Sequence, residues 1–300
     1  HSTSRRQRQM CIRDRQYQCL ARGVITNTCT MAPYRGVSRP VITFTLERLM
    51  DKAARAFGLD PVDLRRRNLI DKFPYKSAMG LEYDEATYKE TLEMAVKAID
   101  VPAFRKRQAE ARAKGRHLGI GIATFSERTG YGSPAFAARG MEITPGWETV
   151  IITVDPSGFV EARIGSSPHG QGLRTTLAQI IADELGITPD MIKVVHGDTD
   201  RTPYGWGTFA SRSLVISGGA TLIAAQKIRT KLIKMASYLL EAATEDIVLT
   251  EGMAKVAGTD KAIAIARLAR EAYTQTHRFK GDIEPGLTDT GHYVPRGSLS

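Results

Sequence analysis

The hydrophobic pattern changes its period near residue 117, and this change constrains the fold more than any other feature of the chain. From Val41 to about Gly115, apolar residues recur every three or four positions, which indicates helices. After His117, short apolar runs bounded by Gly, Pro and Asp indicate strands, with long helices among them. This order predicts layered α+β domains, with mixed sheets packed by helices, and not a repeated βαβ wheel.

Four helices are expected in the first part. In ITFTLERLMDKAARAFG the apolar residues fall on one helical face, which comprises Leu46, Leu49, Met50, Ala53 and Phe57. The next helix begins in DPVDLRRRNLI, where Asp60 suits the N-cap and Pro61 the first helical position. Two further helical stretches cover residues 87–99 and 103–115.

The second part predicts strands and two long helices. We expect strands over residues 118–127, 135–143, 148–154 and 159–165, the last two joined by the tight-turn sequence DPSG. An amphipathic helix follows from Gly172 to Gly186, and then a short strand over 191–197. A second long helix carries the small residues of SGGATLIAA, which permit close backbone packing.

Length and composition suit two soluble globular domains. The chain has 300 residues, 42% of them hydrophobic and 25% charged, which is enough for two interiors of ordinary size. No apolar run reaches the roughly eighteen residues of a membrane span, so we expect none. The cysteines Cys11, Cys19 and Cys29 match neither a zinc site nor a disulfide framework, so we expect a reducing compartment, the cytoplasm.

The net charge of +10 raises an alternative, a non-catalytic basic module that binds nucleic acid or another anionic partner. Residues 1–15 hold five arginines and one aspartate. This segment resembles translated adapter sequence, so we expect a non-native or disordered leader there. The clusters 65–67 and 105–107 lie on expected helices without interleaved aromatic residues, so we expect solvated faces or contacts to partner subunits, and no nucleic acid.

Two loops that precede long helices have the residue types of an anion site. The sequence GQG at 170–172 opens the first helix, and GWGTFASRS opens the second. The N–H groups of a first helical turn have no partner within the helix, and glycines let an anion approach them. Arg212 adds a guanidinium that suits phosphate. Ordinary capping by Ser211 or Ser213 is the alternative, and these residues alone do not decide between the two.

No residue cluster predicts a protein-bound metal ion. Asp198 and Asp200 form a DxD pair, but an acidic turn ahead of a loop is the commoner case. His169 and His196 have no partner at ligand spacing. The chain also has no Walker loop, HExxH or GxSxG motif.

A third stretch, APYRGVSRP at 32–40, carries a resemblance. Together with ERLMDKAARAFGLDPVDLRRRNLI, HGQGLRTTLAQIIADELGI and VVHGDTDRTPYGWGTFASRS, it closely resembles the molybdopterin-binding catalytic subunit of the xanthine dehydrogenase, aldehyde oxidase and carbon monoxide dehydrogenase family. The resemblance extends through LLEAATEDI to GHYVP, over roughly residues 20–295. Motifs of this length in this order are highly specific.

The resemblance implies a cofactor and the residues that hold it. The family carries molybdenum on a pterin with a phosphate, with or without a cytosine dinucleotide tail. The implied ligands are Arg35 and Gly36 near the molybdenum, Gly170, Gln171 and Gly172 at the pterin, and Thr208, Phe209, Ala210, Ser211, Arg212 and Ser213 at the pterin and its phosphate. Val37 and Ser38 would line the substrate pocket.

Gly36 bears on the substrate. Copper-containing carbon monoxide dehydrogenases of the family carry a cysteine in the loop YRCSFR, where this chain has YRGVSR. Because a thiolate is needed to hold copper, the resemblance implies hydroxylation of an aldehyde or an N-heterocycle and not oxidation of carbon monoxide.

The family mechanism implies partners and a longer protein. A glutamate acts as general base, water supplies the oxygen, and electrons pass to 2Fe-2S clusters on a small subunit and FAD on a medium subunit. We expect that glutamate beyond the C-terminus of this chain. Residues 16–115 would then be the C-terminal part of a first molybdenum-cofactor-binding domain and 116–300 the N-terminal part of a second, a fragment that is inactive by itself.

Overall fold

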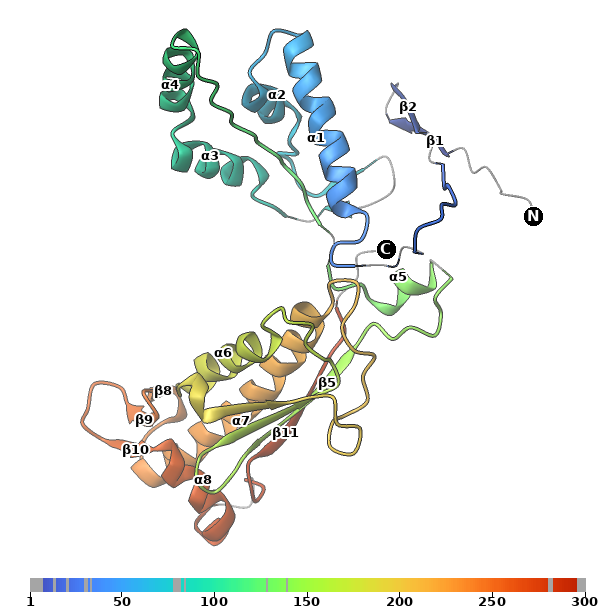
Figure 1. Ribbon diagram of the computed structural model, residues 1–300. Helices are drawn as coiled ribbons and strands as arrows, with labels where there is room; N and C mark the ends of the chain where they lie inside the picture. Colours follow the sequence, from blue (N-terminus) through green and yellow to red (C-terminus); the bar gives the residue numbers. More distant parts are fainter. Residues whose placement is uncertain are drawn as a thin grey trace. The chain divides into compact units, whose positions relative to one another are not determined.

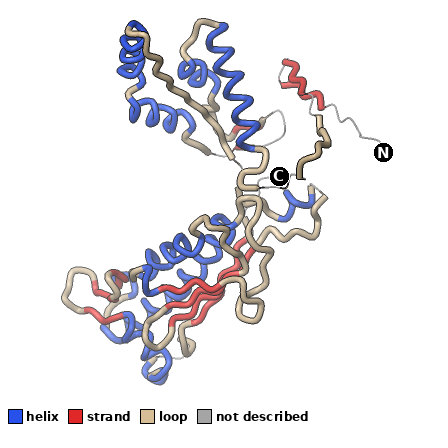
Figure 2. The backbone as a smooth tube through the Cα atoms, in the orientation of Figure 1, coloured by secondary structure: helices blue, strands red, loops and turns tan. Residues whose placement is uncertain are grey.

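The computed structural model describes residues 8–12, 15–19, 22–29, 32, 34–77, 82–83, 85–127, 129–138, 140–279 and 283–295. The chain divides after residue 127 into two compact units (Figure 1). Both units contain helices and strands (Figure 2). The second unit has a mixed sheet packed by helices, so the predicted α+β class is confirmed.

The first unit is mainly helical. Its helices are α1 (Arg39–Ala56), α2 (Pro61–Asn68), α3 (Tyr88–Ile99) and α4 (Val101–Ala113). Its short strands pair as β1 (Arg8–Ile12) with β2 (Arg15–Cys19) and β3 (Tyr75–Lys76) with β4 (Glu82–Tyr83). All four predicted helices are confirmed. Asp60 caps α2 as predicted, because its Oδ1 accepts from the Val62 N–H at 2.7 Å.

The structure assigns a strand within the expected leader. Residues 8–12 form β1, antiparallel to β2, and residues 1–7 lie outside the described residues. The non-native origin of residues 1–15 stays a prediction, as does the proposed boundary at 115/116.

Helix α1 leaves much of its predicted apolar face uncovered within the described residues. Leu46, Leu49 and Phe57 are 45%, 55% and 72% exposed, and Ala54 is the residue that the helix buries. The spacing of apolar residues therefore predicts the helix correctly, whereas it does not predict what covers the helix.

Arg65 corrects the expectation of a solvated basic face. Its side chain is 1% exposed and lies 2.8 Å from a Glu47 carboxylate oxygen and 3.1 Å from one of Asp51. The neighbouring Arg66 is 40% exposed and forms an ion pair with Glu93 at 2.5 Å. Adjacent arginines of one cluster thus have opposite environments, because only one of them lies on the face of α2 that meets α1.

Residues 118–127 do not form the predicted strand. Their alternating apolar residues pack against helices and not within a sheet. Ile120 and Ile122 lie against the buried cluster of Val62, Leu92 and Val101. A period of two therefore indicates here an extended segment that lies across helices.

The second unit is built on a four-stranded sheet of order β11-β5-β6-β7. Its strands are β5 (Glu148–Val154), β6 (Val160–Ile164), β7 (Ile192–Val195) and β11 (Thr288–Tyr293). β6 and β7 are parallel, and the other neighbours are antiparallel. The helices α6 (Leu173–Leu185) and α7 (Gly218–Leu240) cover one face of this sheet (Figure 1). These elements confirm the strands predicted at 148–154, 159–165 and 191–197 and both long helices.

Smaller elements surround the sheet. An antiparallel sheet of order β10-β9-β8 contains β8 (Ile247–Thr250), β9 (Met253–Val256) and β10 (Ala262–Ala264). Helix α8 (Ile265–Thr274) follows it, and single 3-10 turns are η1 (Pro189–Met191), η3 (Thr244–Asp246) and η4 (Thr276–Arg278). The strand predicted at 135–143 is wrong: its first three residues belong to the helix α5 (Ser133–Ala137), because a proline in the first turn favours a helix.

The core of the second unit lies between the sheet and the two long helices. Alternate residues of β5 and β6 point inward, and all of them are fully buried: Val150, Ile152, Val154, Val160, Ala162 and Ile164. Helix α7 comes unusually close to β11, because a Cβ at Gly291 would lie 2.0 Å from the Ala220 carbonyl oxygen. No helix in the described part of the chain is long and apolar enough to cross a bilayer.

We predict that Arg65→Lys destabilises the first unit, whereas Arg66→Lys does not. Lysine has no planar fork with which to donate to both carboxylates, and a loosely paired buried charge is costly. The expected loss for Arg65→Lys is about 2–3 kcal/mol, against less than about 1 kcal/mol for the exposed neighbour. Urea denaturation of the two variants measures the difference, and equal losses would contradict the buried role of Arg65.

Candidate functional site

The loop that follows β6 ends in two left-handed glycines. Gly170 and Gly172 have φ angles of +81° and +80°, and Gly172 is the N-cap of α6. A Cβ built on Gly172 would meet no atom within 4 Å, and Gln171 between them is exposed. The start of α6 is therefore open to a ligand, which would meet first-turn N–H groups and the positive end of the helix dipole.

The loop before α7 contains a turn whose two central residues are left-handed without being glycine. The Phe209 carbonyl accepts from the Arg212 N–H at 3.1 Å, and between them Ala210 and Ser211 have φ angles of +48° and +53°. Such a type I′ turn normally contains Asn or Gly. Each left-handed non-glycine residue costs about 1–2 kcal/mol. Other contacts must therefore hold this turn in place, a situation common at ligand sites.

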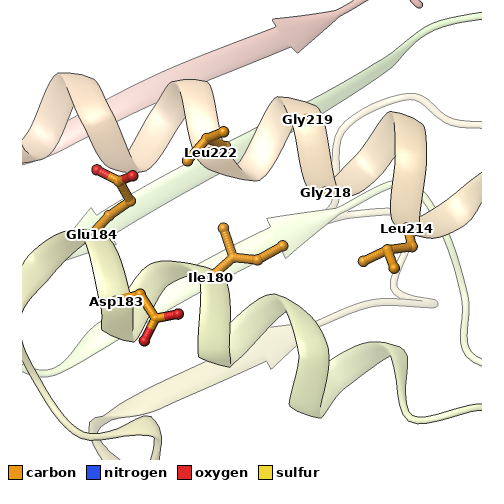
Figure 3. A pocket seen from close by; sticks show the side chains of 7 residues that line it. All are labelled: Ile180, Asp183, Glu184, Leu214, Gly218, Gly219 and Leu222. Atoms are coloured by element: carbon orange, nitrogen blue, oxygen red, sulfur yellow. The ribbon is translucent and has the colours of Figure 1, made fainter. Parts of the chain in front are cut away.

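A π-helical turn, Ser213–Ser217, leads from this turn into α7. Such turns are short and frequent at functional sites. Helices α6 and α7 run in the same direction, with Ile180 opposite Gly218 and Glu184 opposite Leu222 (Figure 3). Both helices therefore begin at the same end of the sheet, and the positive ends of their dipoles lie at that end.

Hydroxyl groups join the two loops. The Thr208 Oγ1 donates to the Ser167 carbonyl at 2.6 Å and lies 2.7 Å from the Ser213 Oγ. The Ser166 and Ser217 hydroxyls are 2.5 Å apart and buried. The structure thus brings Thr208 and Ser213 next to the loop that carries Gln171.

Two glycines let the backbones of the same loops touch. A Cβ on Gly205 would lie 2.6 Å from the Gly165 Cα, and a Cβ on Gly165 would lie 2.7 Å from the Gly205 Cα. Both distances are shorter than real Cβ contacts allow. Any side chain at either position would push the loops apart.

Arg212 lies beneath the turn and not at its surface. Its side chain is fully buried and pairs with the Glu148 carboxylate at the start of β5. The guanidinium also donates to the carbonyls of Gly207 and Trp147, each at 2.9 Å, and lies 5.1 Å from the Phe209 ring centroid. A phosphate would have to displace these partners, so this geometry disfavours the direct phosphate contact predicted for Arg212.

Glu148 is the acidic partner that sequence reasoning missed. It is 1% exposed. Burial raises the pKa of its carboxyl group, and the Arg212 guanidinium opposes that shift. As an ion pair, the two side chains add no net charge to the site. The available signal was a carboxylate at the first position of a buried apolar strand, which needs a cationic partner.

Aromatic residues fix the turn from another side. The Phe209 ring centroid lies 5.7 Å from that of Phe136, which lies 5.9 Å from that of Tyr131. The Gly130 N–H donates to the Ser211 carbonyl at 3.2 Å. Sequence analysis predicted a strand at 135–143 and gave Tyr131 and Phe136 no role in the site.

The first unit holds the remaining predicted residues, 35–38, in a turn before α1. The Val37 N–H donates to the Tyr34 carbonyl at 2.6 Å, and Gly36 and Val37 have φ angles of +80° and +51°. A left-handed conformation is rare for a β-branched residue such as Val37, so this loop is strained. The Arg35 guanidinium lies 5.6 Å from the Tyr34 ring centroid, and Ser38 does not cap α1 through its side chain. The approach of Arg35 to the loops of the second unit stays a prediction.

A cavity of about 380 Å³ lies between α6 and α7 (Figure 3), and none of the predicted ligands is among its lining residues, although Leu214 directly follows Ser213. It is lined by Ile180, Asp183, Glu184, Leu214, Gly218, Gly219 and Leu222. Two carboxylates at an apolar opening do not suit an anionic ligand. This cavity is therefore not the candidate cofactor site.

Two family models described as molybdopterin cofactor-binding domains match the chain, one over residues 10–69 and the other over 94–299. The chain is 38% identical to the nicotine 6-hydroxylase large subunit of Paenarthrobacter nicotinovorans, over 89% of this chain and 33% of that protein. It is 37% identical to the carbon monoxide dehydrogenase large chain of Hydrogenophaga pseudoflava, over 92% of this chain and 35% of that protein.

A solved structure gives the same result. Quinoline 2-oxidoreductase from Pseudomonas putida 86 matches with a TM-score of 0.77 and 37% identity, over 90% of this chain and 34% of that one. The fold of residues 94–299 is that of a molybdopterin cofactor-binding domain. The chain belongs to the family of molybdopterin-binding large subunits of the xanthine dehydrogenase and carbon monoxide dehydrogenase type, as the resemblance indicated. It spans about one third of the length of these relatives.

We predict that Gly205→Ala separates the two loops and destabilises the second unit. The added methyl group would meet Gly165 backbone atoms, which have no side-chain freedom to move aside. A loss of about 1–3 kcal/mol is expected by analogy with overpacked cores. Gly132→Ala is the control, since its Cβ would meet its nearest atom at an ordinary 3.6 Å. Thermal denaturation compares them, and an unchanged melting temperature for Gly205→Ala would refute the close contact.

Proposed function

We propose that this chain supplies the cofactor-binding part of a molybdenum hydroxylase subunit, which hydroxylates an aldehyde or an N-heterocycle with oxygen from water. The observation that carries this proposal is the junction of two loops where α6 and α7 begin. Hydroxyl groups, left-handed glycines and first-turn N–H groups meet there. This is the donor set that a pterin and its phosphate need.

The residues present fit the molybdenum–pterin group. The start of α6 is open at Gly172, and two helix dipoles favour an anion at this end. We assign Gly170, Gln171 and Gly172 to the pterin, and the segment Thr208–Ser213 to the pterin and its phosphate, chiefly through hydroxyls and backbone N–H groups. When bound, the molybdenum group supplies the two-electron chemistry of the hydroxylation. The part of this chain is to hold and orient it.

The turn at 34–38 is assigned to the reacting end of the site. Arg35 would donate hydrogen bonds near the molybdenum ligands, beside Gly36. Val37 and Ser38 would line the substrate pocket. The strained φ of Val37 supports this assignment, because such strain gathers at sites where a side chain has to be aimed.

Gly36 supports an organic substrate over carbon monoxide. A cysteine there would have to adopt the left-handed φ of +80°, with its Cβ only 3.2 Å from the Pro40 Cδ. Because residue 36 is glycine, this position offers no thiolate for copper. The names of two relatives contain nicotine and quinoline, both N-heterocycles, and we favour that class.

We further propose partners for the whole protein. The relatives are described as a large subunit and a large chain, which implies smaller companions. A 2Fe-2S small subunit and an FAD-binding medium subunit would carry the electrons away. A cytosine dinucleotide form of the pterin and a cytoplasmic location belong to the same proposal.

The basic binding module is the weaker alternative. Basic residues of the two clusters face carboxylates in the described structure: Arg65 pairs with Glu47, Arg66 with Glu93, and Arg105 with Asp60 at 3.1 Å. Paired guanidiniums attract phosphates weakly, so these three of the six basic residues in the clusters contribute little to binding nucleic acid.

Metal and pterin analysis of the complete gene product that contains this sequence tests the proposal. The protein is purified from cells able to make the molybdenum cofactor, and molybdenum and the fluorescent pterin oxidation product are measured per subunit. Near-equal amounts of both support the hydroxylase. Absence of both, together with salt-sensitive DNA or RNA binding, would favour the basic module.

For Arg35, we predict that Arg35→Ala in the complete protein lowers turnover at least tenfold, about 1.4 kcal/mol of transition-state stabilisation. The reason is the loss of a charged donor beside the reacting group. Arg48→Ala is the control, because Arg48 is half-exposed on α1 and contacts Asp51. The measurement is steady-state turnover, corrected for the cofactor content of each variant. Unchanged turnover in Arg35→Ala would contradict the assignment of Arg35 to the site.

For Gln171, we predict that Gln171→Ala lowers the pterin content after dialysis about fivefold, as expected for one lost hydrogen bond. Gln179→Ala is the control, since Gln179 is also exposed but lies within α6, eight residues after Gln171. Pterin fluorescence after acid release is the measurement. Equal retention in both variants would place the pterin elsewhere.

A further inference from the structure

The buried pair Glu148–Arg212 holds the two ends of the turn together. The Arg212 guanidinium donates to the Gly207 carbonyl, five residues earlier in the chain, at 2.9 Å. It also donates to the Trp147 carbonyl at 2.9 Å, and its charge pairs with the adjacent Glu148. The Arg212 side chain thus ties the beginning and the end of segment 207–212 to the start of β5.

The strained residues lie at the surface above this pair. Ala210 and Ser211, both with left-handed φ angles, are exposed, whereas Arg212 and Glu148 are fully or almost fully buried. The pair is therefore placed to shape the turn and not to touch what binds on it.

Charge and access both argue against Arg212 as a ligand of the anion. Its charge is balanced by Glu148, so the pair contributes little attraction. The Nε atom is buried and has no acceptor among the described residues, but the Phe209 ring lies over the guanidinium. The guanidinium is fully buried among Phe209, Glu148 and backbone carbonyls, so a ligand does not reach it in this structure.

We propose that Glu148 and Arg212 are positioning residues, which hold Ala210 and Ser211 in the left-handed turn so that the backbone N–H groups and hydroxyls of segment 208–213 face the anionic part of the cofactor. The inference rests on the proposed function for the nature of the ligand. This positioning role and a direct phosphate contact by Arg212 predict different effects of substituting Glu148.

The two roles predict opposite effects of Glu148→Gln. If Arg212 touched the phosphate, removing a neighbouring negative charge would leave anion binding unchanged or stronger. If the pair sets the turn, the same change weakens retention, because Arg212 loses the partner that anchors it. We expect Glu148→Gln in the complete protein to lower pterin and molybdenum content at least about fivefold. Wild-type or higher content would overturn the inference.

Amide hydrogen exchange supplies a readout that does not depend on the cofactor. In cofactor-free protein, Glu148→Gln is expected to speed exchange in segment 208–213 at least about tenfold, with the strands β5 and β6 unaffected. Unchanged exchange in that segment would overturn the inference.

Two further variants separate turn geometry from general stability. Ala210→Gly removes the penalty for a left-handed residue, so adding it to Glu148→Gln is expected to restore at least half of the cofactor content. Failure to restore any of it would overturn the positioning role. If the Glu148→Gln protein does not accumulate in cells, Arg212→Lys is used to test the positioning role instead. Lysine keeps the charge but cannot donate to Gly207, Trp147 and Glu148 together, so cofactor loss supports positioning and full retention contradicts it.

The ion pair Arg201–Glu161, at 2.8 Å in the same unit, is the matched control, because its side chains are 47% and 30% exposed and not buried. Glu161→Gln and Arg201→Lys are expected to leave cofactor content and exchange as in wild type. Wild-type protein without molybdenum and pterin would overturn the proposed function itself, whereas loaded wild type with loaded Glu148→Gln would overturn this inference alone.

Discussion

Two parallel helices that start side by side repel each other at their beginnings, because their dipoles place partial positive charge in the same small volume. Helices α6 and α7 are in this position, since both pack on one face of the sheet and begin at the same end (Figures 1 and 3). The hydroxyls of Thr208, Ser213, Ser166 and Ser217 gather there. An anion at this end would relieve the repulsion, so one geometric constraint accounts for both the loop composition and the proposed ligand.

Local signals predicted much of the fold. Asp60 and Pro61 located the start of α2, and apolar periodicity located α6. The strands at 148–154 and 159–165 followed from their apolar runs and the turn between them. The strand prediction for residues 118–127 was wrong because an extended apolar segment can pack either in a sheet or against helices. Only tertiary contacts decide between the two.

The site was predicted in part. Sequence analysis selected both loops, because glycines and hydroxyls ahead of long helices have a local chemical meaning. It assigned Arg212 to phosphate, although its carboxylate partner comes from a position 64 residues earlier. A buried ion pair and a phosphate site both use arginine. A single sequence does not show whether the arginine pairs with a carboxylate or with a phosphate. Arg65 and Arg66 are adjacent and of the same type, but they differ in burial because their carboxylate partners come from other parts of the chain.

The π-helical turn at Ser213–Ser217 has a consequence for the spacing of this region. A π-turn holds one residue more than a turn of α-helix. Deleting one residue from it would let α7 continue backward as regular α-helix, and everything before it would rotate by about 100° around the helix axis. The hydroxyl-bearing segment would then swing off the end of α6. Length variation, tolerated in most surface loops, should therefore be excluded from this short stretch.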